Sequence, residues 1–310
     1  MIDNSHAIMF HHFYDDKHSP GQGSINQEEF YKILVWLKEN YNLIGANEYF
    51  DKCISKRISD QDICLSFDDG LKCQFDIACP ILEDLNLDSF FFIHTGRFDG
   101  TKDMLEIYRY FRNNYFDSIE DFYNSFFKEV SATNILSIEN EKRKFLKSDY
   151  LAEYSFYTFN DRFFRFLRDR CFSVAEYAQI MMLMIKRFEI NLGLLTNKLY
   201  MSEADIKSLS KKNIIGLHSH NHPTDISELN KKEQLLEYQN NKKILTNFMK
   251  GEILTMSHPC GCYNEDTISI LSSLGIKVGF RDNMLNIPKR SLLEIPREDH
   301  VNILKKMKAK

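Results

Sequence analysis

Two groups of ionisable side chains in this sequence have the spacing of a metal-assisted hydrolytic site. Asp68 and Asp69 are adjacent and precede Gly70, while His218 and His222 are four residues apart. Two neighbouring carboxylates repel each other, so keeping both ionised requires a bound cation or a shared proton. Neutral imidazoles together with a carboxylate suit Zn²⁺, and they also accept Co²⁺, Ni²⁺ or Fe²⁺. The pattern therefore predicts a transition-metal site.

Both groups follow short apolar runs that are typical of buried strands. Such runs alternate with segments of helical periodicity, which favours an α/β fold with parallel strands. The loops that follow parallel strands converge at one face, so the aspartates and histidines are expected to meet there. The expected strands are residues 7–13, 63–67, 89–94, 214–217, 253–256 and 276–280. The expected helices start after Asn26, at residue 75, and after Ser202, Asn230 and Asp266.

The alternation of strands and helices is interrupted between residues 98 and 200. This segment is rich in Phe and Tyr, has no proline and shows helical spacing, for example in residues 161–170 and 174–188. Helical spacing predicts that its aromatic side chains form a core instead of a ligand site. We therefore expect a discontinuous α/β domain of residues 1–97 and 201–310, with residues 98–200 as an inserted helical subdomain or lid.

Composition excludes several classes of partner. The chain has 310 residues and a net charge of −4, which argues against a nucleic-acid or anionic-membrane surface. No apolar run is long enough to span a bilayer, and the first residues lack the pattern of a secretory signal. The seven cysteines show no disulfide spacing. Reduced thiols and a cytoplasmic location are expected.

Three stretches together resemble the motifs of the polysaccharide deacetylases, which form carbohydrate esterase family four. Residues 66–70, Ser-Phe-Asp-Asp-Gly, resemble the family's T-F-D-D-G motif. His218-Ser219-x-x-His222 matches its H-[ST]-x-x-H motif, and residues 256–264 resemble its third motif. The resemblance covers about residues 6–97 and 201–300. It implies a distorted (β/α)₇ barrel with a helical insertion.

The resemblance also implies a role for each matching residue. Asp68 would be the general base, and Asp69, His218 and His222 would bind the metal. The backbone N–H of Cys260 would act beside the metal as an oxyanion donor. The substrate implied is an N-acylated amino sugar.

The general acid is less directly indicated. Most family members carry it in a C-terminal Leu-x-His motif, whereas His300 here follows Glu-Asp. A circularly permuted bacterial branch carries this histidine near the N-terminus, and Phe10-His11 resembles its Tyr-His pair. Because side chains alternate along a strand, only one of His11 and His12 should face the site. His11 is the predicted acid; the alternative is that both are ordinary strand-end histidines.

The third motif departs from the family pattern. Many members have an arginine there that orients the base, but this chain has Ser-His-Pro-Cys at residues 257–260. Arg297 resembles an arginine found late in bacterial members and is predicted to supply that charge, with a surface ion pair as the alternative. Cys260 and Cys262 are too isolated to indicate a thiolate metal site.

The predicted function is removal of an N-acyl group, foremost N-acetyl, from a precursor or intermediate of surface-glycan synthesis. An N-formyl sugar or another amide would need the same chemistry, and a catalytically silent sugar-binding protein is the alternative from another class. The insertion is expected to close over the substrate or to mediate homo-oligomerisation.

Overall fold

The computed structural model describes residues 5–100, 104–152, 157–287 and 291–309. The chain forms two compact units, one of residues 1–103 and 196–310 and the other of residues 104–195. The second unit lies within the segment in which the α/β alternation of the sequence is interrupted.

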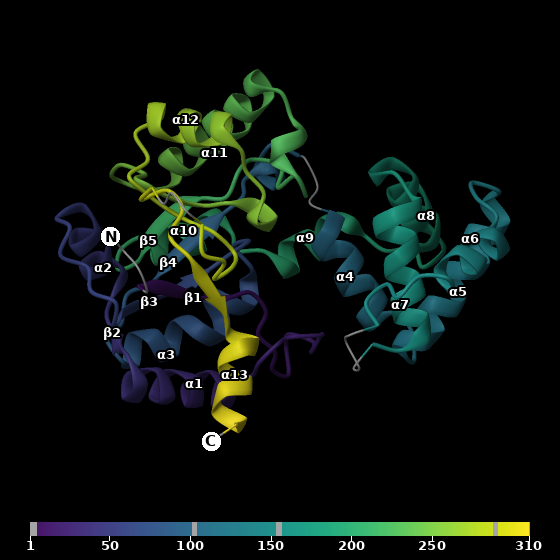
Figure 1. Ribbon diagram of the computed structural model, residues 1–310, viewed down its shortest axis with the longest axis horizontal. Helices are drawn as coiled ribbons and strands as arrows, with labels where there is room; N and C mark the ends of the chain where they lie inside the picture. The colour runs from purple at the N-terminus through teal and green to yellow at the C-terminus, as the bar shows by residue number, and fades with distance from the viewer. Residues whose placement is uncertain (1–4, 101–103, 153–156, 288–290, 310) are drawn as a thin grey trace. The chain divides into compact units, whose positions relative to one another are not determined.

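The first unit is a nearly closed barrel of seven parallel strands. Helices surround these strands, as Figure 1 shows. The predicted α/β barrel is thereby confirmed. The strand order is β7-β6-β5-β4-β3-β1-β8, and the short strand β2 pairs with β3 outside this path. The strands are β1 His6–Phe10, β2 Asn42–Leu43, β3 Asp62–Phe67, β4 Phe90–Ile93, β5 Ile214–Leu217, β6 Thr255–Ser257, β7 Val278–Phe280 and β8 Arg297–Asp299.

The barrel closes through the segment that leads into β8. Ile295 forms a parallel bridge with Phe280, and its N–H donates to the carbonyl of Gly279 at 2.9 Å. A Cβ atom at Gly279 would lie 2.7 Å from the carbonyl oxygen of Leu293. The closing segment can therefore pass only against a residue without a side chain.

Alternate residues of the strands fill two separate cores, as the two-residue period of a strand requires. Phe90, Phe92 and Phe280 belong to a cluster that includes Ala7 and Cys64, and all are fully buried. The intervening residues, such as Leu65 and Phe91, pack in a second cluster with the surrounding helices. Arg297 lies above the first cluster, with its guanidinium carbon 5.8 Å from the Phe92 ring centre.

The helices of this unit begin where the sequence places capping residues. Asn26 and Asn230 each form a complete capping box with the glutamate three residues later. The α-helices of the unit are α1 Gln27–Asn40, α2 Ala46–Ile54, α3 Cys79–Asp84, α10 Glu203–Leu209, α11 Lys231–Phe248, α12 Glu265–Ser273 and α13 His300–Lys308. The sequence reading had not anticipated α2, β2, β8 or α13.

The helix expected from residue 75 is not a single α-helix. Residues Gln74–Ala78 form a π-helical turn, and α3 starts only at Cys79. Pro80 stands in the first turn of α3, where its missing N–H breaks no helical hydrogen bond. The proline thus sets the boundary between the two segments.

The second unit is helical and has an aromatic core, as expected from its composition. Phe111, Phe122, Phe126 and Phe164 are fully buried, and the rings of Phe126 and Phe164 meet edge to face at 4.9 Å. Its helices are α4 Met104–Asn114, α5 Ile119–Thr133, α6 Ile138–Phe145, α7 Phe159–Phe166 with a π-helical end to Cys171, α8 Val174–Arg187 and the start of α9 Leu192–Leu199.

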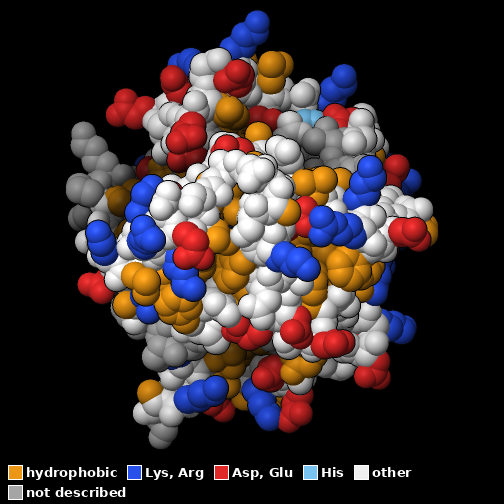
Figure 2. Space-filling model, turned by 90° about the vertical axis from the view of Figure 1, so that its right-hand side faces the viewer, with side chains coloured by type: hydrophobic (Ala, Val, Ile, Leu, Met, Phe, Trp, Pro, Cys, Tyr) orange, Lys and Arg blue, Asp and Glu red, His pale blue; other side chains and the backbone are white. Residues whose placement is uncertain are grey.

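The surface carries mixed charge. On the face that Figure 2 shows, Lys and Arg side chains are interspersed with Asp and Glu, in keeping with the small net charge. In the described part of the chain, no helix is both long and apolar enough to cross a membrane. All seven cysteines are free thiols.

Candidate active site

The two aspartates follow β3 directly. The backbone of Asp69 has φ 75° and that of Gly70 has φ 66°, so the chain turns sharply in the left-handed region. Such a φ is uncommon for an aspartate and is frequent at functional sites. The turn sends the side chains of Asp68 and Asp69 to different partners.

The two histidines belong to the loop after β5. His218 is buried, and its N–H donates to Oδ1 of Asn241 at 2.9 Å. Ser219 and His222 also have left-handed backbones, with φ 60° and 52°. This turn brings the His222 ring back over His218, with the ring centres 4.9 Å apart. The spacing of four residues therefore works here through a turn and not through a helix.

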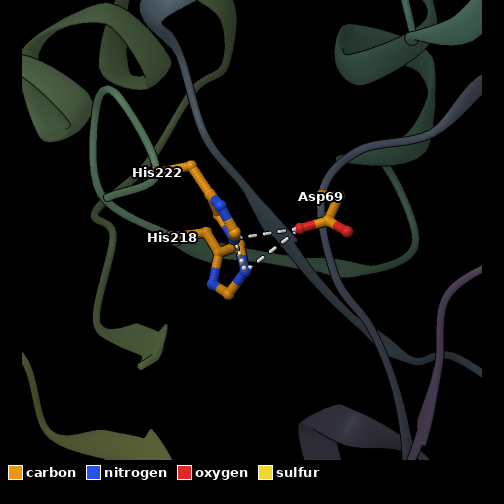
Figure 3. Close-up of side chains that lie close together, drawn as sticks. All are labelled: Asp69, His218 and His222. Carbon is orange, nitrogen blue, oxygen red and sulfur yellow. Dashed lines mark hydrogen bonds and ion pairs between the residues drawn. The ribbon is translucent and has the colours of Figure 1, made fainter. Parts of the chain in front are cut away.

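Asp69, His218 and His222 form a compact triangle of donor atoms. Oδ1 of Asp69 lies 3.3 Å from Nε2 of each histidine, and the two Nε2 atoms are 3.2 Å apart. Figure 3 shows the Asp69 carboxylate facing both rings. Among the described residues, this is the group of His, Cys, Asp and Glu side chains placed to hold a metal ion.

The triangle fits a transition metal. Donors about 2.1 Å from a tetrahedral ion are about 3.4 Å from one another, close to the separations found. Nδ1 of His218 lies 3.0 Å from the Ser257 carbonyl oxygen, so it carries the proton and leaves Nε2 as a ligand. Oδ1 of Asp69 is buried, and within the described residues its polar contacts are with Nε2 of His218 and of His222, neither of which is a hydrogen bond. A cation would satisfy it.

Electrostatics favour charge on these donors despite burial. Burial by itself raises the pKa of Asp69, but His218 and His222 hold that pKa well below its ordinary value. Burial by itself lowers the pKa of His218, but Asp68 and Asp69 raise it above its ordinary value. The cluster therefore attracts positive charge, whether as protons or as a metal ion.

Asp68 has a different partner. Both Nη atoms of Arg297 donate to its two carboxylate oxygens, each at 2.6 Å, and Arg297 is buried. Arg297 therefore contacts the predicted base and is buried, so the alternative of a surface ion pair is wrong, while its role in orienting the base stays a prediction. The Ser257 hydroxyl also donates to Oδ2 of Asp68 at 3.2 Å.

This environment keeps Asp68 ionised. Burial raises its pKa, but Arg297 and then His218 lower it to below the ordinary value. A carboxylate offers about four acceptor positions, and three are used by Arg297 and Ser257. One position is left for a proton from a reacting group. The Asp68 carboxylate also lies 3.9 Å from Nε2 of His218, at the edge of the donor triangle.

His11 also lies beside Asp68. Its Nε2 atom is 3.9 Å from Oδ2 of Asp68, and 29% of its side chain is exposed. Burial lowers the pKa of His11, with Asp69 and Asp68 opposing the shift and His12 adding to it. β1 ends at Phe10, so strand alternation does not decide between His11 and His12, and that argument was wrong. Their rings instead stack 6.1 Å apart.

His300, the other alternative for the acid, is engaged elsewhere. Its ring stacks on Phe10 at 5.3 Å, and its Nε2 atom lies 3.0 Å from the carbonyl oxygen of Gly23. His300 is buried in these contacts at the start of α13. Its position disfavours a role in proton transfer at Asp68.

Cys260 stands in the 3₁₀ turn Pro259–Gly261 that follows β6. Its backbone has φ 51°, and its side chain is exposed. The turn belongs to the same end of the barrel as the aspartates and histidines, because all follow parallel strands. The role of its N–H as an oxyanion donor stays a prediction.

Several supporting residues were not found by sequence reasoning. Gln74 donates from Nε2 to the carbonyls of Asp68 and His11, at 2.6 and 2.8 Å, and so ties the predicted base to the predicted acid. Asn241 binds the His218 N–H and also donates to the Ile93 carbonyl at 2.9 Å. One signal was present, since Asn241 occupies a buried position of the inner stripe of α11. A polar residue there needs a specific partner.

Comparison with known families agrees with the motifs. A family model described as polysaccharide deacetylase matches residues 184–279, which include His218, His222 and the third motif. The predicted resemblance to this family is thereby confirmed. No curated protein matches the chain.

Solved structures share the fold over nearly the whole chain. The deacetylase PplD of Streptococcus pyogenes, in complex with acetate, has a TM-score of 0.56 at 14% identity, covering 97% of this chain and 96% of its own. A de-N-acetylase from Aggregatibacter actinomycetemcomitans has a TM-score of 0.55 at 13% identity, covering 94% and 93%. IcaB from Ammonifex degensii has a TM-score of 0.55 at 13% identity, covering 95% and 91%. At these identities the likeness establishes the fold.

Proposed function

Because the chain has the polysaccharide deacetylase fold and matches that family's model, we propose that it is a metal-dependent hydrolase of an N-acyl amino sugar. The acyl group proposed is acetyl. One observation carries this proposal above the others: three donor atoms lie 3.2–3.3 Å apart beside an ionised aspartate. A sugar-binding protein without activity has no need of this costly arrangement of charges.

The chemistry divides among the residues as follows. Asp69, His218 and His222 would hold a divalent ion such as Zn²⁺, Co²⁺, Ni²⁺ or Fe²⁺. A metal bound there would lower the pKa of water towards about 7 and polarise the acyl oxygen. Asp68, kept ionised by Arg297, accepts the proton of the attacking water.

Two further groups complete the proposed reaction. The backbone N–H of Cys260 donates to the oxyanion that develops on the acyl oxygen, a contact whose loss typically costs about 10²-fold or more in rate. His11 donates a proton to the departing amine, since an amine leaves poorly without one. In this scheme the acid His11 and the base Asp68 act on opposite sides of one acyl group, with environments that separate their pKa values.

We further propose that the substrate is a precursor or intermediate of surface-glycan synthesis and that the protein acts in the cytoplasm. The N-terminal position of His11 supports membership of the permuted bacterial branch. The helical unit of residues 104–195 is proposed as a lid or an oligomerisation element.

The first test measures metal and product together. Protein purified without chelator is analysed for bound metal, next to His218→Ala and, as a control outside the site, His18→Ala. Near-stoichiometric metal is expected in the wild type and in His18→Ala, and none in His218→Ala. If the wild-type protein binds no metal, even after addition of Zn²⁺ or Co²⁺, the proposal is wrong.

Product analysis then identifies the acyl group. Free N-acetylglucosamine, its oligosaccharides and nucleotide-linked forms are incubated with the metal-loaded protein, alongside the N-formyl analogues. Release of acetate supports the deacetylase assignment. Release of formate alone would move the assignment to a deformylase on the same site.

A further inference from the structure

Ser257 stands at the meeting point of the predicted base, its arginine and one predicted metal ligand. It is the last residue of β6 and is fully buried. Its Oγ atom lies 2.8 Å from Nη2 of Arg297 and 3.2 Å from Oδ2 of Asp68. Its carbonyl oxygen lies 3.0 Å from Nδ1 of His218.

The direction of these hydrogen bonds is fixed by chemistry. A guanidinium only donates, and an ionised carboxylate only accepts. Oγ of Ser257 therefore accepts from Arg297, and its single proton goes to Asp68. The hydroxyl thus has one satisfying orientation, and it restrains the rotation of the Asp68 carboxylate.

Every hydrogen-bond donor of the Arg297 guanidinium is used in this arrangement. Each of its five N–H groups has an acceptor. Two of these acceptors are the carboxylate oxygens of Asp68, and the other three belong to other residues. These are the carbonyl of Arg281 for Nε, Oγ of Ser66 for Nη1 and Oγ of Ser257 for Nη2. Since Arg297 is buried, loss of the Ser257 hydroxyl leaves one N–H without an acceptor, an unfavourable state.

The size of Ser257 matters as well. Ser257 is fully buried, so its side chain has little free space around it. The guanidinium of Arg297 comes from β8, and its Nη2 atom is within hydrogen-bonding distance of Oγ of Ser257. Because both side chains are buried and already in contact, a longer side chain at position 257 would meet the Arg297 guanidinium. A small hydroxyl residue both leaves room for the arginine and binds it.

We propose that Ser257 is a positioning residue of the hydrolytic site. Its hydroxyl fixes the Asp68 carboxylate against Arg297, while its carbonyl fixes the His218 ring so that Nε2 faces the metal donors. This inference rests on the proposed function. The roles of the hydroxyl and of the carbonyl can be tested separately, because a side-chain substitution removes the hydroxyl and keeps the carbonyl.

The kinetics of the Ser257→Ala variant test the proposed role of the hydroxyl. The expected result is a fall in kcat of about tenfold, with KM and metal content within about twofold of the wild type. Thr255→Val is the matched control: Thr255 is two residues earlier on β6, is buried, and its hydroxyl has no hydrogen-bond partner in the described structure. Its kcat is expected to stay within about twofold.

Two kinetic outcomes would overturn the inference: an unchanged kcat in Ser257→Ala, or equal losses in Ser257→Ala and Thr255→Val. Loss of bound metal in Ser257→Ala would also contradict it, since the carbonyl that holds His218 is retained.

A crystallographic comparison tests the positioning role without a substrate. It therefore remains a valid test even if the wild type releases no acyl product, an outcome that would contradict only the proposed function. In Zn²⁺-loaded Ser257→Ala, the Asp68 carboxylate is expected to rotate out of its two-point contact with Arg297. An unmoved carboxylate, superposing on that of the Zn²⁺-loaded wild type, would refute the positioning role.

Discussion

Replacing Arg297 by methionine tests the electrostatic design of the site. The substitution keeps most of the side-chain volume but leaves Asp68, which is 2% exposed, as a buried carboxylate without its main counter-charge. Breaking a buried ion pair in this way typically costs about 3–5 kcal/mol of stability. For a domain of this size, we expect a fall in the unfolding midpoint on the order of 10 °C.

The loss should depend on pH. In the wild type, the pKa of Asp68 is lowered, because Arg297 and His218 outweigh the effect of burial. The carboxylate thus stabilises the fold above its unfolded-state pKa of about 4, and this contribution is lost as the pH falls through the lowered value. In Arg297→Met, burial raises the pKa of Asp68. The protonated carboxyl then stabilises the variant at low pH, and this contribution is lost as the pH rises.

Thermal unfolding of metal-free protein from pH 5 to pH 8 measures this difference. The gap between wild type and Arg297→Met is expected to be largest near pH 8 and to shrink towards pH 5. Arg297→Lys serves as the control, since it keeps one positive charge without the two-point contact. Its unfolding midpoint should lie between those of the wild type and Arg297→Met. A gap that is the same at every pH, or a midpoint change below about 2 °C, would refute the reasoning.

Three further substitutions probe the remaining parts of the site. Asp68→Asn should abolish turnover and retain metal; metal loss measured by elemental analysis would contradict its assignment as base. His11→Gln should lower kcat by about 10²–10⁴-fold with metal content unchanged, and a wild-type rate would remove His11 as the acid. Asn241→Leu should lower stability to urea by about 1–3 kcal/mol, because the His218 N–H and the Ile93 carbonyl lose their partner; unchanged unfolding would show that these bonds contribute nothing.

The local features of the molecule could be predicted because short-range chemistry controls them. The capping box at Asn26 involves residues three apart, and strand β5 was predicted with its observed bounds from the short run Ile-Ile-Gly-Leu. Asp69, His218 and His222 could be proposed as donors because each follows a strand and has a distinctive residue type, and the structure brings the three together. Parallel strands then bring such loops to one face of the fold.

The sequence alone determined the fold class and was enough to predict which residues would bind a metal. The tertiary structure alone decided which of the other polar residues meet. Arg297 reaches Asp68 across 229 positions of the chain, and Ser257 joins them from a third strand. It was also the structure that ended β1 before His11 and turned His300 towards Gly23. Contacts of this kind depend on barrel closure and on the path of side chains through the core, and neither leaves a periodic signal in the sequence.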